Sequence, residues 1–246
     1  METCCLMRTA TRRWILMRSF QSFTLADFST WLFALTPART ITHLQIHHTW
    51  RPTHADYAGE RTIRGMWEYH VQTNGWQDIG QHLSIAPDGM IWDGRDFELD
   101  PACIQGHNSG GICIEMIGDF DEGQDVLEGN QLTSVITTCA LLLEQFTLNL
   151  SDIVFHNDHS EKSCPGTSIS KDWFIRQVEG AMDAGKADAF TKEAGFHDVP
   201  SSSLAARSID LLHGKGILAG DPDGSFRPKD SVTREELAMI LHRLID

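Results

Sequence analysis

The sequence predicts an α/β protein in which a mixed β-sheet is flanked by helices and followed by a small all-α domain at the C-terminus. Stretches that alternate apolar and polar residues, as half-buried strands do, are interleaved with stretches whose apolar residues recur at helical spacing. After residue 182 the chain becomes small and polar, and two further helical patterns follow. These observations indicate one larger α/β domain and one smaller helical domain.

The expected strands cover residues 41–48, 82–86, 90–93, 112–117 and 152–156. The second and third of these are joined by Pro87-Asp88-Gly89, which is a turn signal. The expected helices cover residues 23–36, 62–73, 132–146, 168–182, 203–215 and 233–245. In the third helix Cys139 falls on the apolar side, where we expect it to pack as a small apolar residue.

The chain of 246 residues suits one domain of about 150 residues plus a smaller one. We place an N-terminal extension at 1–22, the larger domain at 23–186 and the smaller at 187–246, with a polar linker at 183–193. The formal net charge of −14 argues against nucleic acid as a partner, because nucleic-acid binding requires clustered Lys and Arg. No apolar run is long enough for a membrane span.

The N-terminal segment contains arginines but lacks the continuous apolar stretch of a signal peptide. We therefore expect the protein to be made in the cytoplasm without a visible export signal. Met1 and Met17 are both plausible start positions.

Nitrogen and sulfur ligands occur where expected strands end. His47 and His48 lie at the end of 41–48, His156 ends 152–156, and Cys164 follows eight residues later. Imidazole and thiolate are the ligands that zinc prefers, and three protein ligands with one open position are typical of a catalytic site. This spacing indicates a metal site on strand ends, with its open position facing solvent.

The segment 156–166 (HNDHSEKSCPG) resembles the closing motif of the N-acetylmuramoyl-L-alanine amidase family, which includes phage lysozyme-type amidases and peptidoglycan recognition proteins. Other landmarks of that family follow one another in the same order: His47-His48-Thr49, 75–82 (GWQDIGQH), Asp88-Gly89, Gly94-Arg95, Gly106-His107-Asn108 and 111–118 (GICIEMIG). The resemblance covers roughly residues 41–182. It implies the amidase/peptidoglycan recognition fold and hydrolysis of the bond between N-acetylmuramic acid and L-alanine in peptidoglycan.

The resemblance implies that Zn²⁺ is held by His47, His156 and Cys164. Phage lysozyme-type members carry a catalytic Tyr where this chain has Gln81, which cannot exchange a proton in the same way. The muropeptide-recycling branch lacks that Tyr and has a catalytic Glu at the position of Glu115. We therefore expect Glu115 to be the general base; the alternative is a paired core carboxylate.

Further residues are expected around this centre. Lys162 is predicted to stabilise the developing oxyanion, the alternative being a solvated loop lysine. Glu115 or His159 is expected to return a proton to the leaving nitrogen. Asp78 is a candidate partner for the second N–H of a ligating histidine. Residues expected to brace the ligands or shape the substrate groove, as opposed to simply packing, are His48, Asp78, Gln81, His82, His107, Asn108 and His159.

The C-terminal stretch resembles a single S-layer homology (SLH) repeat, through 196–200 (FHDVP), 216–220 (GILAG), 222–228 (PDGSFRP) and 233–236 (TREE). The resemblance implies binding to a secondary cell-wall polymer, often pyruvylated, with Arg234 facing the anion and Asp198 and Gly220 nearby. Leu204 stands where the family usually has Trp. The apolar sides of the two expected helices should face each other, for example Ile209 and Leu241.

Such repeats commonly occur in threes, so the oligomeric state stays open between a monomer and a trimer formed through the lone repeat. The function expected from both resemblances is that of a phage or prophage endolysin acting on the cell wall. The alternatives are a host autolysin with the same activity, a non-catalytic peptidoglycan-binding protein and a cytoplasmic muropeptide-recycling enzyme. Cys164 argues against the non-catalytic protein, and the wall-binding repeat argues against the recycling enzyme.

Overall fold

The computed structural model describes residues 18–191, 196–199 and 205–245. Its described residues form two compact units, which divide between Ala181 and Met182. The first unit is a mixed sheet with helices, and the second contains helices at its beginning and end. The predicted fold class is therefore confirmed. Met17, Leu204 and most of the predicted N-terminal extension lie outside the described residues.

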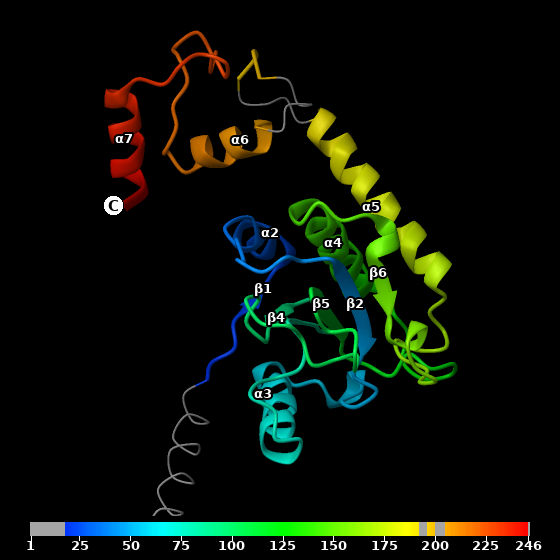
Figure 1. Ribbon diagram of the computed structural model, residues 1–246. Coiled ribbons are helices and arrows are strands. Elements are labelled where there is room, and N and C mark those ends of the chain that lie inside the picture. Colours follow the sequence, from blue (N-terminus) through cyan, green and yellow to red (C-terminus); the bar gives the residue numbers. More distant parts are fainter. Residues whose placement is uncertain (1–17, 192–195, 200–204, 246) are drawn as a thin grey trace, which may run out of the picture. The chain divides into compact units, whose positions relative to one another are not determined.

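Among the described residues, six strands form one sheet in the order β1-β4-β3-β5-β2-β6 (Figure 1). Their bounds are Ser22–Phe23 (β1), His43–His48 (β2), Leu83–Ile85 (β3), Ile91–Asp93 (β4), Gly111–Met116 (β5) and Ile153–Phe155 (β6). Strands β3, β5, β2 and β6 are parallel, while β4 and β1 are antiparallel to their neighbours. The carboxyl ends of β2 and β6 therefore lie at the same edge of the sheet, where binding sites of such sheets form.

The two faces of this sheet differ in chemistry, because successive side chains of a strand point to opposite sides. Leu44 and Ile46 of β2 share one face with Ile112 and Ile114 of β5, and all four are fully buried. The opposite face, called the polar face below, carries His43, Gln45, His47, Ser84, Cys113 and Glu115. One face therefore supplies the core, and the other presents the groups capable of chemistry.

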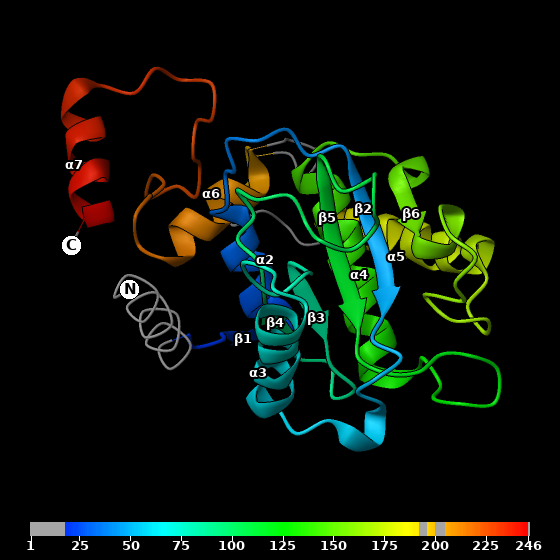
Figure 2. The ribbon, with the colours of Figure 1, turned by 60° about the horizontal axis from the view of Figure 1, so that its bottom comes forward.

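Helix α4 (Gly129–Gln145) packs along the sheet, and α2 (Leu25–Phe33) packs against α4 (Figure 2). Buried residues of α4 include Val135, Leu142 and Cys139, which packs as a small apolar residue as expected. Gln131 fixes the start of α4, since its amide donates to the carbonyls of Ile85 (3.0 Å) and Ile117 (2.8 Å). This helix therefore braces the sheet from behind without covering the polar face.

Helix α3 (Glu60–Glu68) continues into a π-helical turn (Tyr69–Thr73) and packs near the β4 side of the sheet. Its Met66 and Trp67 belong to a hydrophobic cluster with Trp92 of β4 and Phe20. Short 3-10 turns cover His54–Asp56 (η1), Leu150–Asp152 (η3) and His156–Asp158 (η4). The last of these begins with a predicted metal ligand.

Two boundaries differ from the sequence prediction. Phe20 and Ser22, the first residue of β1, belong to the first unit, although residues 1–22 were predicted as an N-terminal extension; a two-residue strand is too short to show alternation. Helix α5 (Lys171–Thr191) continues through most of the predicted polar linker at 183–193. This part of the chain contains several alanines, which favour helix strongly, and a small polar composition does not itself stop a helix.

The second unit contains α6 (Ala206–Gly214) and α7 (Arg234–Ile245). Its buried cluster consists of Phe196, Val199, Ala206 and Ile209, with Phe226 packed against it. The prediction that the two helices bury their apolar sides against each other is wrong for α7. Its apolar residues Leu237, Met239, Leu241 and Leu244 are between 46% and 53% exposed. The aromatic loop residues Phe196 and Phe226 fill this core, which α7 was expected to cover.

Within the described ranges, no helix combines the length and apolar character that crossing a membrane requires.

Candidate metal centre

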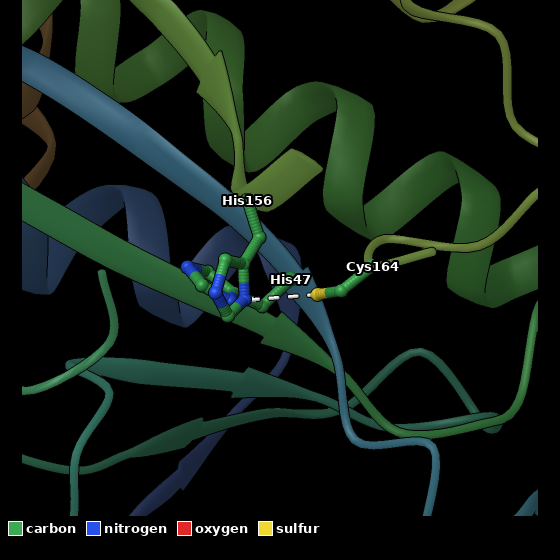
Figure 3. Close-up of side chains that lie close together, drawn as sticks. All are labelled: His47, His156 and Cys164. Carbon is green, nitrogen blue, oxygen red and sulfur yellow. Dashed lines mark hydrogen bonds between the residues drawn. The ribbon is translucent and has the colours of Figure 1, made fainter. Parts of the chain in front are cut away.

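The three predicted ligands His47, His156 and Cys164 converge at one edge of the sheet (Figure 3). His47 lies near the end of β2, His156 directly follows β6, and Cys164 lies on the loop beyond η4. Nitrogen and sulfur atoms of the three side chains all lie within 4.8 Å of one another. The distance from His47 Nδ1 to Cys164 Sγ is 3.5 Å, and the two imidazole centroids are 4.6 Å apart.

Backbone hydrogen bonds hold the loop that carries Cys164. The Asn157 N–H donates to the Cys164 carbonyl at 2.9 Å, and the His48 N–H donates to Cys164 Sγ at 3.3 Å. The His48 ring itself is buried, and its Nδ1 accepts the Phe120 N–H at 3.1 Å. His48 therefore braces the sulfur ligand through its backbone and does not line the groove.

The electrostatics of these three groups suit a cation. Burial, with the charges of neighbouring His156, His48 and Lys162, holds the pKa of His47 well below its ordinary value. Burial likewise lowers the pKa of His156 to about 4, so both imidazoles are neutral at pH 7 and offer lone pairs. Burial raises the pKa of the Cys164 thiol to about 12, so a thiolate at this position requires a nearby positive charge.

His47 Nε2 is buried and has no hydrogen-bond partner among the described residues. Two imidazoles and one sulfur at this spacing form a donor set that zinc prefers, and a catalytic zinc takes its fourth ligand from outside the protein. The residues present therefore fit a Zn²⁺ ion.

Glu115 lies beside this donor set, because it is paired with His47 in the register of β2 and β5. Its carboxylate makes no hydrogen bond or ion pair among the described residues, which argues against a paired core carboxylate. Burial raises the pKa of Glu115 to about 7. A carboxyl group with this pKa can both accept and return a proton near neutral pH.

Gln81 lies on the other side of Glu115. It is almost fully buried, and its amide donates to the Ser84 hydroxyl at 3.0 Å, while Ser84 is paired with Glu115 in the sheet. Lys162 is exposed, and its charge contributes to the lowered pKa of both His47 and His156. Gln81 is therefore linked to the strand position beside Glu115 through Ser84, and Lys162 lies near enough to the two imidazoles for its charge to act on them.

A cavity of about 290 Å³ adjoins the polar face and is lined by His43, Gly106, His107, Ser109, Val154 and His159. The rings of His107 and His159 stack with centroids 3.7 Å apart and an interplanar angle of 18°. These two predicted groove residues therefore do line a cavity. His43 was not among the predicted residues, although its alternation with His47 on the same strand places both on one face.

Three residues of the predicted groove or ligand brace serve the scaffold. Asp78 accepts from Arg18 at 3.0 Å and contacts no ligating histidine among the described residues, so its predicted role as their partner is wrong. His82 is fully buried, and its Nδ1 accepts the Cys113 N–H at 3.0 Å. Asn108 accepts the N–H groups of Cys103 (3.0 Å) and Ile104 (2.8 Å). Each satisfies a backbone or side-chain group that would otherwise lack a partner.

A disulfide that was not predicted joins Cys103 and Cys113. Both sulfur atoms lie within 4.8 Å of a ring nitrogen of His47. The available signal was positional: Cys113 lies two residues before Glu115 on the same expected strand, hence on the same face.

In the second unit, the three residues predicted to bind polymer have different surroundings. The Asp198 carboxylate accepts the N–H groups of Phe226 and Arg227, both at 2.7 Å. Gly220 has no room for a side chain, because a Cβ there would lie 2.0 Å from the Phe196 ring. Arg234 is exposed at the start of α7. Asp198 and Gly220 therefore shape the loop, whereas Arg234 is exposed to solvent.

Known proteins match both units. A family model described as N-acetylmuramoyl-L-alanine amidase matches residues 37–167, and one described as S-layer homology domain matches residues 195–238. An N-acetylmuramoyl-L-alanine amidase of Sus scrofa is 35% identical over 80 residues, which are 31% of this chain but only 13% of that protein. An endolysin of Klebsiella phage KP32 is 26% identical over 113 residues, covering 45% of this chain and 74% of that protein.

Among solved structures, the amidase LysC from Clostridium intestinale URNW is 24% identical with a TM-score of 0.49, covering 57% of this chain and 87% of LysC. The amidase model covers more than half of the chain, and it contains the converging His47, His156 and Cys164. The chain therefore belongs to the N-acetylmuramoyl-L-alanine amidase family and carries an S-layer homology domain behind its amidase domain.

Proposed function

We propose that this protein hydrolyses the amide bond between N-acetylmuramic acid and L-alanine in peptidoglycan, with Zn²⁺ held by His47, His156 and Cys164. The observation that carries the proposal is the convergence of these three donors beside Glu115, a half-buried residue whose carboxylate makes no hydrogen bond or ion pair among the described residues. Membership of the amidase family supports the choice of bond.

The chain's own residues provide the remaining chemistry. When bound, Zn²⁺ supplies Lewis acidity toward a water molecule and the scissile carbonyl. Glu115, with its pKa near 7, accepts the proton of the attacking water. Lys162, whose charge acts on both imidazoles, stabilises negative charge that develops on the carbonyl oxygen. Glu115 or His159 returns a proton to the leaving nitrogen of L-alanine.

We further propose that the second unit, which begins at Met182, holds the enzyme on a secondary cell-wall polymer. The S-layer homology match and the exposed Arg234 support this role, because a guanidinium suits an anionic group such as a pyruvylated sugar. The similarity to a phage endolysin over most of that protein's length supports a lytic enzyme of phage or prophage origin.

Metal analysis combined with loss of turbidity of purified sacculi tests the proposal. We expect one zinc ion per chain and clearing of the sacculi. The Glu115→Gln variant should keep its zinc and lose the clearing. Purified protein that takes up no stoichiometric zinc would refute the metal centre, and an active Glu115→Gln variant would refute the base. Hydrolysis of soluble muropeptides alone would identify a recycling enzyme.

A further inference from the structure

His47 belongs to two donor sets at once. Besides His156 and Cys164, a nitrogen of its ring lies within 4.8 Å of both Cys103 Sγ and Cys113 Sγ. Cys113 is paired with Gln45 on β2, and the next pair on the same face of the sheet is Glu115 with His47. The disulfide therefore lies on the polar face immediately beside the proposed metal centre.

Hydrogen bonds hold both cysteines in place independently of the bond between their sulfur atoms. The Cys113 N–H donates to His82 Nδ1 at 3.0 Å, and the Cys113 carbonyl accepts the His82 N–H at 2.9 Å. On the other side, Asn108 Oδ1 accepts the Cys103 N–H at 3.0 Å, and the adjacent Ala102 N–H donates to the Gly80 carbonyl at 3.0 Å. The two side chains would therefore stay close to each other after reduction.

Two buried polar atoms without a hydrogen-bond partner belong to described residues beside this cysteine pair. Among the described residues, the buried side-chain atoms without a hydrogen-bond partner are Arg18 Nε, Gln45 Oε1, His47 Nε2 and Thr138 Oγ1. His47 is in the second donor set, and Gln45 is paired with Cys113. A buried polar atom without a partner is costly, so two of them around one cysteine pair indicate an interaction that a ligand can satisfy.

We propose that reduction of the Cys103–Cys113 disulfide opens an alternative metal site, formed by His47, Cys103 and Cys113, which competes with the catalytic set for the same ion. This inference rests on the proposed function insofar as His47 also belongs to the catalytic metal centre. A neutral imidazole offers a single lone pair, so His47 serves one set at a time. The alternative set exchanges one imidazole for a second thiolate, which is a favourable donor set for zinc.

The redox step needs a dithiol reductant. Its thiolate attacks Cys103 Sγ, the sulfur of the partly exposed cysteine, and Cys113 leaves as a thiolate. The second thiol of the reductant then resolves the mixed disulfide. The reductant becomes a disulfide, and two electrons and two protons convert the Cys103–Cys113 bond into two thiols. Binding of a divalent ion as the dithiolate releases those two protons.

The enzyme would therefore hydrolyse its substrate slowly wherever dithiol reductants keep thiols reduced. The ion held by Cys103 and Cys113 leaves His156 and Cys164 without it, and hydrolysis slows. In an oxidising environment the disulfide forms again and returns the ion to the catalytic set. For a wall-degrading enzyme this would confine activity to the compartment in which its substrate lies.

Cobalt(II) tests the proposal, because each cobalt–thiolate bond adds to a sulfur-to-metal charge-transfer absorption in the near ultraviolet. Every variant carries Cys4→Ser and Cys5→Ser, so that these two thiols cannot bind the probe. The test variant adds Cys164→Ser, which removes the catalytic thiolate. Its matched control also carries Cys103→Ser and Cys113→Ser. Protein is reduced with a phosphine, freed of it by gel filtration without oxygen, and titrated with cobalt(II); circular dichroism verifies folding.

We expect the reduced Cys164→Ser variant to bind one cobalt ion with thiolate absorption, and its oxidised form and the control to show none. With Cys164 intact, reduction should double the absorption per bound ion, from one cobalt–thiolate bond to two, and slow hydrolysis. Absence of thiolate absorption in the reduced test variant, or an unchanged absorption per ion with Cys164 intact, would overturn the proposal. An oxidised protein with Cys164 that binds no cobalt would instead refute the catalytic metal centre.

Discussion

The two units of this chain differ in whether their polar groups have hydrogen-bond or ion-pair partners. On the polar face of the first unit, His47 Nε2 has no partner among the described residues, and burial raises the pKa of both Glu115 and Cys164. In the second unit, Asp198 accepts two backbone N–H groups, and Asp221 pairs with Arg227. Polar groups left unsatisfied beside one another indicate a reactive centre, whereas satisfied loop carboxylates indicate a scaffold for surface recognition.

Replacing a metal ligand should have the largest effect, and it should impair the first unit while leaving the second unit's wall binding unchanged. With the Cys103–Cys113 disulfide intact, we expect Cys164→Ser to lose zinc and to lower hydrolysis of sacculi by more than the roughly 10²–10⁴-fold that one proton-transfer group contributes. Wall binding should persist. Zinc analysis and a sedimentation assay with sacculi measure the two effects. The matched control is Cys139→Ala, a buried cysteine in α4, which should keep zinc and activity despite lower thermal stability. Equal loss of zinc in both variants would contradict the assignment.

Glu115→Gln tests whether the chemistry of the first unit depends on a proton acceptor. Since the amide has the same shape but cannot take the proton, kcat should fall by about 10²–10⁴-fold with zinc content unchanged. The rate of release of soluble fragments from sacculi measures this. A variant that retains most of its kcat would show that another group accepts the proton.

Arg234→Ala tests the second unit alone. Loss of one charge-assisted contact, about 1.5–3 kcal/mol, should weaken binding to intact walls by roughly 10–100-fold. Hydrolysis of soluble muropeptides should not change, because Arg234 belongs to the S-layer homology unit. Binding isotherms on walls with and without their secondary polymers measure the effect; unchanged affinity for both would remove the proposed role.

A smaller effect concerns the stability of the first unit in acid. Burial lowers the pKa of His82 to about 3, below its value of about 6.5 in an unfolded chain. Its contribution to stability is therefore fully present above pH 6.5 and is lost as the pH falls toward 3. Between pH 8 and pH 5 this loss is about 2 kcal/mol.

The His82→Gln variant, whose amide oxygen can still accept the Cys113 N–H, should lack this part of the pH dependence. Urea unfolding at the two pH values measures the difference between the two proteins. The same pH dependence in both would show that His82 titrates normally in the folded protein.

Much of the fold and the metal centre could be predicted because the signals are local and regular. Alternation along β2 and β5 separates the apolar face from the polar face, and His47 and His156 lie at strand ends whose parallel pairing brings them together. The order of motifs along the chain then identified the family. The same alternation would have placed His43 and Cys113 on the polar face.

Other features depend on pairing between distant segments, which periodicity does not reveal. The contact of Asp78 with Arg18 joins residues sixty positions apart, and the Cys103–Cys113 bond requires a loop to fold back on β5. The exposed apolar side of α7 differs from the prediction because the loop residues Phe196 and Phe226 fill the core of the second unit. Amphipathic spacing predicts that a helix has an apolar side, but not which element covers it.

Mass spectrometry of sacculi digested by the purified zinc-loaded protein identifies the bond that is cleaved. We expect glycan strands with free lactyl carboxylates, together with peptides that begin with a free L-alanine amino group. Products in which every lactyl–alanine bond is intact, whether cleaved in the glycan or elsewhere in the peptide, would contradict it.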